Sequence, residues 1–416
     1  MTEQNFNAAY AMQEIGGGVT AAKGFVAAGI HAGIKNNPAK RDLALLASEV
    51  PAVCGGVFTQ NKFAAAPVNW CRKVNAQGKA RAIVVNSGNA NACTGQTGDE
   101  HAAQMAQAVG GALNIPTNEV LVCSTGVIGV EMPIKTVLDG VSAIAGKLSY
   151  EGGKDAAEAI MTTDTCLKQC AVTYEYQGKL ITVGGMAKGS GMIHPNMATM
   201  LCFITTDLAI EQSALQKAVA EAAGATFNMV TVDGDTSTND TMLVLANGVA
   251  ANEPVAANNE GYAAFVAALT FVAARLAKLM AYDGEGATKL LECVVSGAAT
   301  LKDARLAAKA VVGSSLVKSA FYGEDANWGR IICAAGYSGA EFDTQAVNLR
   351  LESVAGGIDL MQNGAGLKFN EELAARILQE REIKILLSLG NGAYTATSWG
   401  CDLSHEYVNI NADYRS

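Results

Sequence analysis

The 416-residue sequence is poor in the side chains that build metal centres and disulfide scaffolds. It has ten cysteines and four histidines, and no two cysteines follow the CxxC spacing. The closest pair, Cys166 and Cys170, has no histidine at metal-ligand spacing. This usage argues against a disulfide-stapled secreted domain and predicts no metal site. We therefore expect a reducing compartment, the cytoplasm, and cysteines that serve as core residues.

Basic blocks and apolar runs of membrane length are also missing. Lys and Arg number 30 against 39 Asp and Glu, a formal net charge of −9, so we expect neither a nucleic-acid nor a membrane partner. The longest apolar stretch, Tyr262–Ala274, is soon followed by Arg275 and Lys278, which favours a buried helix over a membrane span. Half of the residues are hydrophobic and only 17% are charged, which excludes a disordered chain.

The chain instead alternates between strand-like and helix-like segments, which predicts a mixed α/β fold with sheets covered by helices. Strands are predicted at Ala80–Asn86, Glu119–Ser124, Cys170–Tyr176, Lys179–Gly184, Ala198–Thr206, Met229–Val232, Met242–Ala246 and Lys289–Ser296. Helices are predicted at Asp99–Leu113, Ile134–Leu148, Glu211–Ala225, Gly261–Met280 and Leu301–Phe321, and the tail Ile383–Asn411 is predicted mostly as strand. Gln177-Gly178 suits a tight hairpin, and no internal domain boundary stands out.

The chemistry is most visible in the glycine-rich segment Gly185–Leu201, GMAKGSGMIHPNMATML. Thr199 stands where this loop leads into a predicted strand. If the peptide bond before it were cut, its new α-amine, with a pKa near ~8, would act as a base for its own hydroxyl. A threonine that merely starts a strand is the commoner explanation of the residues alone. The sequence has no phosphate-binding loop, nucleophile elbow or dinucleotide-binding glycine motif.

The same segment resembles the self-cleavage signature of the ornithine acetyltransferase family, the bifunctional glutamate N-acetyltransferases of arginine biosynthesis. Further segments resemble this family in the same order along the chain: Gly18–Phe25, Val85–Gly95, Ser124–Gly129, Met161–Thr165, Thr231–Asp240, Asp283–Lys289, Tyr322–Arg330 and Asn409–Tyr414. The chain departs from the family pattern at Ala22 and Leu167, where proline is usual, and at Ser416, where threonine is commoner.

The resemblance implies stacked β-sheets flanked by helices, an αββα-like layering similar to that of N-terminal-nucleophile hydrolases but differently connected. It also implies a precursor that cuts itself between Ala198 and Thr199. Residues 1–198 then form an α fragment and residues 199–416 a β fragment that begins with the nucleophile. The two fragments are expected to associate, as an α2β2 heterotetramer.

The implied activity is acetyl transfer from N2-acetylornithine to glutamate through an acetyl-threonine on Thr199, by a ping-pong mechanism. Thr125 and Gly126 would form the oxyanion hole. The resemblance implies no metal and no cofactor, and it leaves open whether acetyl-CoA is a second acetyl donor.

The implied substrate-binding residues are Thr162, Lys188, Thr199, Glu285, Asn411 and Ser416. Both substrates carry an α-carboxylate, for which Lys188 is the best cation, and Glu285 would hold the distal ammonium of ornithine. The neighbouring Thr163 and Thr165 remain alternatives to Thr162.

Two other functions would fit part of this pattern. A self-cleaving aminopeptidase or amidohydrolase would use Thr199 in the same way but pass the acyl group to water. A non-catalytic metabolite-binding protein would not need to keep Thr199, Lys188 and Thr125 together. Asp233, Asp235 and Asp240 could suggest a metal site, but their spacing lacks the EF-hand pattern, so we interpret them as a structural turn network. His194 could assist the self-cleavage, but a loop histidine without such a role is the commoner explanation.

Overall fold

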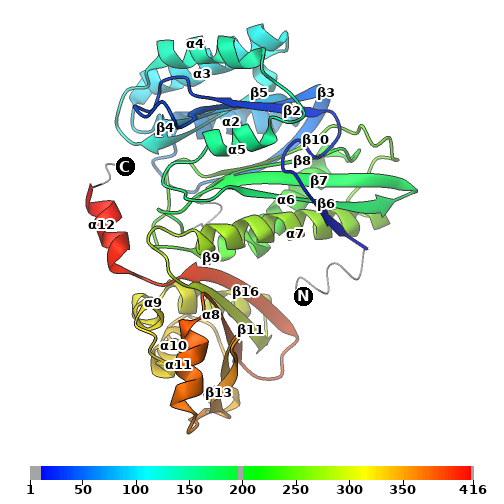
Figure 1. The fold of residues 1–416 in the computed structure, drawn as a ribbon. Helices are drawn as coiled ribbons and strands as arrows, with labels where there is room; N and C mark the ends of the chain where they lie inside the picture. Colours follow the sequence, from blue (N-terminus) through cyan, green and yellow to red (C-terminus); the bar gives the residue numbers. More distant parts are fainter. Residues whose placement is uncertain (1–10, 195–199, 414–416) are drawn as a thin grey trace.

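The computed structural model describes residues 11–194 and 200–413. In this part of the chain the strands form two mixed sheets, one of nine strands and one of seven, and helices cover both (Figure 1). This arrangement confirms the predicted α/β class. The bounds of the elements follow, sheet by sheet.

The first sheet has the order β1-β6-β7-β8-β10-β3-β4-β5, and β2 pairs with β3 at its side. Its strands are β1 (Gln13–Ile15), β2 (Phe25–Ile30), β3 (Leu43–Phe58), β4 (Lys79–Asn89), β5 (Val120–Val127), β6 (Lys168–Tyr176), β7 (Lys179–Lys188), β8 (Leu201–Thr206) and β10 (Thr241–Ala246). The second sheet has the order β14-β13-β12-β15-β11-β16-β9. Its strands are β9 (Val230–Thr231), β11 (Leu290–Ala298), β12 (Asn348–Ser353), β13 (Gly356–Gln362), β14 (Ala365–Gly366), β15 (Glu382–Ser388) and β16 (Tyr394–Cys401).

The helices of the first half of the chain are α2 (Ala66–Gln77), α3 (Gly95–Leu113), α4 (Ile134–Ala145) and α5 (Gly153–Ala159). Those of the second half are α6 (Gln212–Ala225), α7 (Glu260–Tyr282), α8 (Leu301–Gly313), α9 (Ser315–Tyr322), α10 (Trp328–Gly336), α11 (Glu371–Gln379) and α12 (His405–Asp413).

The long strand β3 folds the first sheet over on itself. Its first part, Leu43–Ala47, pairs with β2 and β4, and its last part, Val53–Phe58, pairs with β10. Between them Glu49–Pro51 are exposed, and the register with β4 shifts. A bulge of this kind bends a strand and increases its twist. The two halves of the sheet therefore face each other.

The apolar side chains of the folded sheet separate into three layers, as the alternation of side chains along a strand requires. One cluster fills the space between the two halves, with Leu46 and Ile83 on one side and Phe203 and Leu243 on the other. A second cluster packs against α3 and α4. A third lies between the half of the sheet that contains β6, β7, β8 and β10 and the helices α6 and α7. The order helix, sheet, sheet, helix is visible in Figure 1 and confirms the predicted αββα layering.

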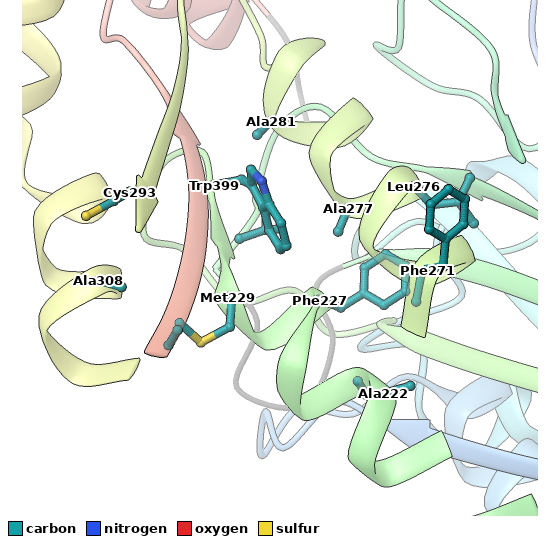
Figure 2. Packing of buried hydrophobic residues seen from close by; sticks show 14 of the residues in the cluster. Ala222, Phe227, Met229, Phe271, Leu276, Ala277, Ala281, Cys293, Ala308 and Trp399 are labelled. Carbon is teal, nitrogen blue, oxygen red and sulfur yellow. The ribbon is translucent and has the colours of Figure 1, made fainter. Parts of the chain in front are cut away.

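Helix α7 joins the layered part to the second sheet. It packs on β6 and β7 and also on β16. Figure 2 shows Trp399 of β16 between that strand and the α7 residues Ala277 and Ala281. Although α7 is long and apolar enough to cross a membrane, 61% of its most apolar window is buried inside the protein. The prediction of a buried core helix is therefore confirmed.

Most of the predicted elements are present, and two predictions are wrong. The segment Leu301–Phe321 is not one helix, because Ser314 adopts an extended conformation and its hydroxyl accepts a hydrogen bond from the Val317 N–H, which starts α9. Serine favours this N-cap position over a helix interior. The tail is strand only as far as Cys401, and His405–Asp413 is helical. The predicted strand Ala198–Thr206 is found from Leu201 onward, and Ala198 and Thr199 lie outside the described residues.

The predicted hairpin at Gln177-Gly178 is confirmed. Both residues have positive φ, 52° and 67°, which is the conformation that a two-residue hairpin turn requires. The hairpin pairs β6 with β7 along their whole lengths, so that Lys168 at the start of β6 lies opposite Ala187 near the end of β7. This pairing brings the two buried lysines, Lys168 and Lys188, to the same end of the sheet.

Candidate active site

Residues from distant parts of the chain line one pocket of about 100 Å³ at the ends of strands in the folded sheet. Every predicted catalytic or substrate-binding residue within the described chain lines it: Thr125, Gly126, Thr162, Lys188, Glu285 and Asn411. Ala198, Thr199 and Ser416 lie outside the described residues. Met200, the next residue along the chain from Thr199, lines the same pocket and is only 4% exposed. The structure therefore brings together the predicted set, as far as it is described.

Lys188, the last residue of β7, presents a buried ammonium group to this pocket. Its Nζ donates to the Thr162 hydroxyl over 2.7 Å and lies 3.4 Å from the Thr125 hydroxyl. Within residues 11–194 and 200–413, its carboxylate partner is Asp164, at 4.0 Å. Burial lowers the pKa of Lys188 below its ordinary value, and the Asp164 charge offsets part of that effect.

Thr125 and Gly126 belong to β5 and do not end it, because the strand continues to Val127. Gly126 has a φ of +132°, and a Cβ there would stand 2.3 Å from the backbone of Gly88 in β4. Only glycine tolerates both this conformation and this close approach. The pairing with β4 becomes irregular at the same point, which ends the regular ladder beside the pocket.

Glu285 enters the pocket from the loop after α7. Its N–H donates to the Ser190 carbonyl over 2.9 Å, which ties this loop to the segment after Lys188. Its carboxylate accepts a hydrogen bond of 2.8 Å from the Asn411 amide of α12. The carboxylate packs against Gly191, where a Cβ would lie 2.2 Å from Oε2. Gly191 therefore admits the side chain of Glu285.

The glycines beside Glu285 serve the packing of other elements. A Cβ on Gly284 would stand 2.8 Å from the Cys401 sulfur of β16, and one on Gly286 would stand 2.6 Å from the Tyr407 nitrogen of α12. Gly284 and Gly286 therefore allow β16 and α12 to approach this loop closely. The loop is glycine-rich because three elements converge on it.

The three candidate threonines have different partners. Thr162 accepts from Lys188, Thr163 shares a hydrogen bond of 2.7 Å with Ser190, and Thr165 donates to Asp283. Thr162 and Thr163 line the pocket, whereas Thr165 does not. The geometry thus favours Thr162, the predicted residue, with Thr163 as its neighbour.

The described residues that precede the proposed cleavage site are held by Asp233. Its carboxylate accepts from the N–H groups of Met192 and Ile193 over 2.6 and 2.9 Å. It also accepts from the Tyr407 hydroxyl over 3.2 Å. These contacts agree with the structural interpretation of Asp233.

His194 follows directly and forms a 3.0 Å hydrogen bond with the Thr231 hydroxyl. Burial, with the nearby charge of Lys309, lowers the pKa of His194 to about 4. The imidazole is therefore neutral at physiological pH.

In the described part of the chain, no three His, Cys, Asp or Glu side chains are grouped as ligands of a metal ion.

Sequence reasoning missed a buried ionic cluster behind the pocket, formed by Asp164, Lys168 and Asp283. Lys168 donates to Asp164 over 2.7 Å and also to Asp283, and all three side chains are at most 4% exposed. Burial would raise the pKa of Asp164, but the Lys168 and Lys188 charges hold it well below its usual range. The four-residue spacing of Asp164 and Lys168 could have indicated an ion pair. Spacing alone does not show that the pair is buried.

Asn239, before β10, is a second residue that was missed. Its amide donates to the carbonyls of Ala90 and Ser124 over 2.6 and 2.9 Å. These bonds tie the loop before β10 to the ends of β4 and β5, and Asn239 itself lines the pocket. It lies in the Thr231–Asp240 segment, which resembles the family and in which only the three aspartates were interpreted as a turn network.

The fold and the pocket define a layered α/β enzyme whose site is small, polar and positively charged at Lys188. The ArgJ family model matches residues 26–416. The chain belongs to the ArgJ family, and its activity is that of an ornithine acetyltransferase in arginine biosynthesis. The family membership thus favours acetyl transfer over the hydrolytic and non-catalytic alternatives.

The chain is 55% identical over 406 residues to the arginine biosynthesis bifunctional protein ArgJ of Symbiobacterium thermophilum, covering 97% of this chain and 100% of that protein. It is 53% identical to the protein of the same description from Caldanaerobacter subterraneus, covering 97% and 100%. Among solved structures, ornithine acetyltransferase from Mycobacterium tuberculosis in complex with ornithine is 44% identical, with a TM-score of 0.43. That match covers 45% of this chain and all of the other.

Proposed function

We propose that the chain cuts itself between Ala198 and Thr199, and that the freed Thr199 carries the acetyl group between the two substrates. The observation that carries this proposal is the convergence of Thr125, Lys188 and Glu285 on one pocket that Met200 also lines. Thr199 directly precedes Met200 in the sequence, which supports its assignment to this pocket.

The cleavage needs only the chain itself and one water molecule. The Thr199 hydroxyl attacks the Ala198 carbonyl carbon, the C–N bond breaks, and the acyl group moves to the threonine oxygen while the α-amine is released. Water then hydrolyses the ester and leaves a carboxylate on Ala198 and a free hydroxyl on Thr199. The amine, with a pKa near ~8, becomes the base for that hydroxyl.

The first half-reaction transfers the acetyl group from N-acetylornithine to the enzyme. The Thr199 oxygen attacks the acetyl carbonyl, and the charge that develops on the carbonyl oxygen is stabilised by the Thr125 hydroxyl and the Gly126 N–H. The amide bond breaks, ornithine leaves with the proton taken from the threonine hydroxyl, and an acetyl ester remains. In the second half-reaction the glutamate amine attacks this ester and regenerates Thr199.

The two substrates share an α-carboxylate and differ at the far end. Lys188 is buried and held by the Thr162 hydroxyl, and it supplies a fixed cation for the shared carboxylate. Glu285, fixed by Asn411, supplies a carboxylate for the distal ammonium of ornithine. Ornithine is the ligand in the solved structure of the Mycobacterium tuberculosis relative, which supports ornithine as the leaving product here.

The two fragments are proposed to stay together after the cut. Strand β8, in the second fragment, pairs with β7 of the first fragment from Lys188↔Leu201 to Val183↔Thr206. On its other side β10 pairs with β3 of the first fragment. A cut before Thr199 leaves these hydrogen bonds and the core between the sheet halves intact, so the fragments are expected to co-purify. Association into α2β2 is proposed on the family resemblance.

The self-cleavage is tested by comparing the Thr199→Ala and Thr199→Ser variants with the wild-type protein. Denaturing gels and N-terminal sequencing should find two fragments in the unvaried protein, with a second N-terminus that reads Thr-Met-Leu-Cys. Thr199→Ala should remain one inactive chain, because it lacks the attacking oxygen. Thr199→Ser keeps the oxygen and should still cut itself. Full activity in an uncut chain would contradict the proposal. Release of ornithine over many turnovers without glutamate would instead indicate an amidohydrolase, because acetyl transfer releases only one ornithine per site before glutamate is needed.

A further inference from the structure

Asp164 does not line the pocket, yet it touches three groups that do. Its Oδ1 accepts from the Gly189 N–H over 2.7 Å, and its Oδ2 accepts from the Thr162 N–H over 3.0 Å. The same carboxylate lies 4.0 Å from the Lys188 ammonium. The Asp164 side chain is fully buried, so these contacts use its oxygens without competition from solvent.

These contacts enclose the pair that the substrate carboxylate is proposed to meet. Lys188 Nζ and the Thr162 hydroxyl are joined by a 2.7 Å hydrogen bond. Asp164 holds the backbone of Thr162 on one side and that of Gly189, which follows Lys188, on the other. One side chain therefore fixes both ends of this bond and adds a compensating charge.

We propose that Asp164 is a positioning residue of the acetyl-transfer reaction, which orients Lys188 and Thr162 for the substrate α-carboxylate and keeps Lys188 charged. The proposal rests on the role proposed above for Lys188. Groups that bind a reacting molecule must be held within about 0.5 Å of the productive geometry by their own neighbours. Asp164 is the group in the described structure that contacts both members of the pair.

The charges around Lys188 predict a measurable signature. Burial lowers the pKa of Lys188, and the Lys168 charge acts in the same direction. The Lys188 charge in turn lowers the pKa of the neighbouring Lys35. Asp164 opposes them most strongly, ahead of Glu285 and Asp240. Removing the Asp164 charge should therefore let Lys188 lose its proton at a lower pH. Loss of an opposite charge at this distance shifts a pKa by about one unit or more.

Asp283 offers a matched control. It is the other carboxylate on Lys168 and is also buried, with its side chain 4% exposed. Its remaining contacts are to the Thr165 hydroxyl and to the N–H groups of Thr165 and Cys166, outside the pocket. Asp164→Asn and Asp283→Asn each remove one negative charge from Lys168. Only the first removes a charge beside the Lys188–Thr162 pair and replaces one of the two oxygens that accept from the N–H groups of Thr162 and Gly189.

The experiment measures kcat/KM for N-acetylornithine against pH in both variants and in the unvaried enzyme. Asp164→Asn should shift the alkaline limb of the kcat/KM profile to lower pH by about one unit. At pH values above the shifted limb, its kcat/KM should be lower than that of the wild-type enzyme by about tenfold or more. Activity should recover as the pH is lowered, which a misfolded protein would not do. Asp283→Asn should keep the alkaline limb of the unvaried enzyme. An unmoved limb in Asp164→Asn, or equal shifts in both variants, would overturn the proposal.

Two further variants keep the outcomes separable. Asp164→Glu retains the charge but displaces the oxygens, so it should keep the alkaline limb and still lose kcat/KM; full activity would overturn the positioning role even if Asp164→Asn does not fold. Lys188→Met tests the proposed function itself. If its kcat/KM is unchanged, the role of Lys188 fails. If its kcat/KM falls while Asp164→Asn behaves like Asp283→Asn, only the positioning role fails.

Discussion

Two buried lysines lie at the same end of the β6–β7 hairpin, in very different surroundings. Lys168 is 1% exposed and makes ion pairs with Asp164 and Asp283. Although burial alone would lower the pKa of Lys168, these two carboxylates raise it above its ordinary value. Lys188 is 8% exposed, contacts two hydroxyls and has one carboxylate at 4.0 Å, and its pKa is lowered.

The difference shows that burial by itself does not mark a functional lysine. The charge of Lys168 is compensated within the protein, so that residue has a structural role. The charge of Lys188 is compensated only in part, and it faces a pocket, so a ligand carboxylate can complete its environment. The number and distance of the carboxylate partners distinguish the two cases.

The same division runs through two short segments of the sequence. In residues 161–165, Thr162 contacts Lys188, whereas Thr165 contacts Asp283. In residues 283–286, Asp283 belongs to the ionic cluster and Glu285 lines the pocket. The first segment thus contributes Asp164 to the structural cluster and Thr162 and Thr163 to the site, and the second contributes Asp283 to the cluster and Glu285 to the site.

The largest expected effect is on stability, from Lys168→Met. The substitution leaves Asp164 and Asp283 buried without their shared cation. Removing one partner of a buried ion pair costs about 3–5 kcal/mol, because the remaining charge is uncompensated. The denaturant midpoint should fall markedly in unfolding followed by circular dichroism. An unchanged midpoint would show that the two lysines do not differ in the way described.

Lys188→Met should do the opposite, with a small effect on stability and a large one on activity. The lost contact to a desolvated substrate carboxylate corresponds to about 2–5 kcal/mol, so kcat/KM should fall roughly 30-fold or more for both substrates. Steady-state kinetics with N-acetylornithine and glutamate measure this. A loss for one substrate alone would contradict a shared carboxylate site.

Thr125→Ala removes the second hydroxyl near Lys188. If this hydroxyl stabilises the oxyanion, kcat should fall by roughly 10–10³-fold while KM changes much less. Thr125→Ser, which keeps the hydroxyl, is the matched control and should retain most of the activity. Equal kcat values in all three proteins would exclude the role assigned to Thr125.

Glu285→Gln keeps the size of the side chain and removes its charge. Loss of the partner of a desolvated ammonium costs about 1–3 kcal/mol, so kcat/KM for N-acetylornithine should fall by roughly 5- to 150-fold. Glutamate should be affected far less, because its distal carboxylate gains nothing from Glu285. A ping-pong analysis gives both values. Equal losses would make Glu285 a scaffold residue, and a loss confined to glutamate would reverse the polarity of the pocket.

His194 extends the comparison with the two lysines to a half-buried imidazole. The nearby positive charge of Lys309 disfavours the protonated form of this imidazole. The folded-state pKa of about 4 lies below the ordinary value of 6.5. The neutral form is therefore favoured by folding, and its contribution to stability is complete above pH 6.5 and is lost as the pH falls towards 4. His194→Gln should flatten the stability profile in this window. An identical slope in the variant would contradict the assignment.

Much of the layered fold could be predicted from local patterns. The alternation of apolar residues located β4, β6, β7 and α7, because these elements bury one face or all faces in a regular period. The bend of β3 at Glu49–Pro51 could not be predicted in this way, since it depends on pairing with β10, far away in the chain. The break at Ser314 was missed because apolar residues continue on both sides of it.

The candidate site was predicted through motifs that resemble a family, and its supporting residues were not. Lys188 and Glu285 lie in glycine-rich segments, which can be recognised in the sequence itself. Asp164 lies in the Met161–Thr165 motif, but its role depends on contacts with Gly189 and Lys168 that only the β6–β7 pairing creates. Sequence spacing does not report which of two buried lysines will face a pocket.

The most direct test of the account is to follow the acetyl group itself. Purified enzyme is incubated with N-acetylornithine without glutamate, and its fragments are analysed by mass spectrometry. The account predicts that the fragment beginning at Thr199 gains the mass of one acetyl group, located on Thr199, and loses it when glutamate is added. An active enzyme whose second fragment never carries the acetyl group, or whose chain is uncut, would contradict the account.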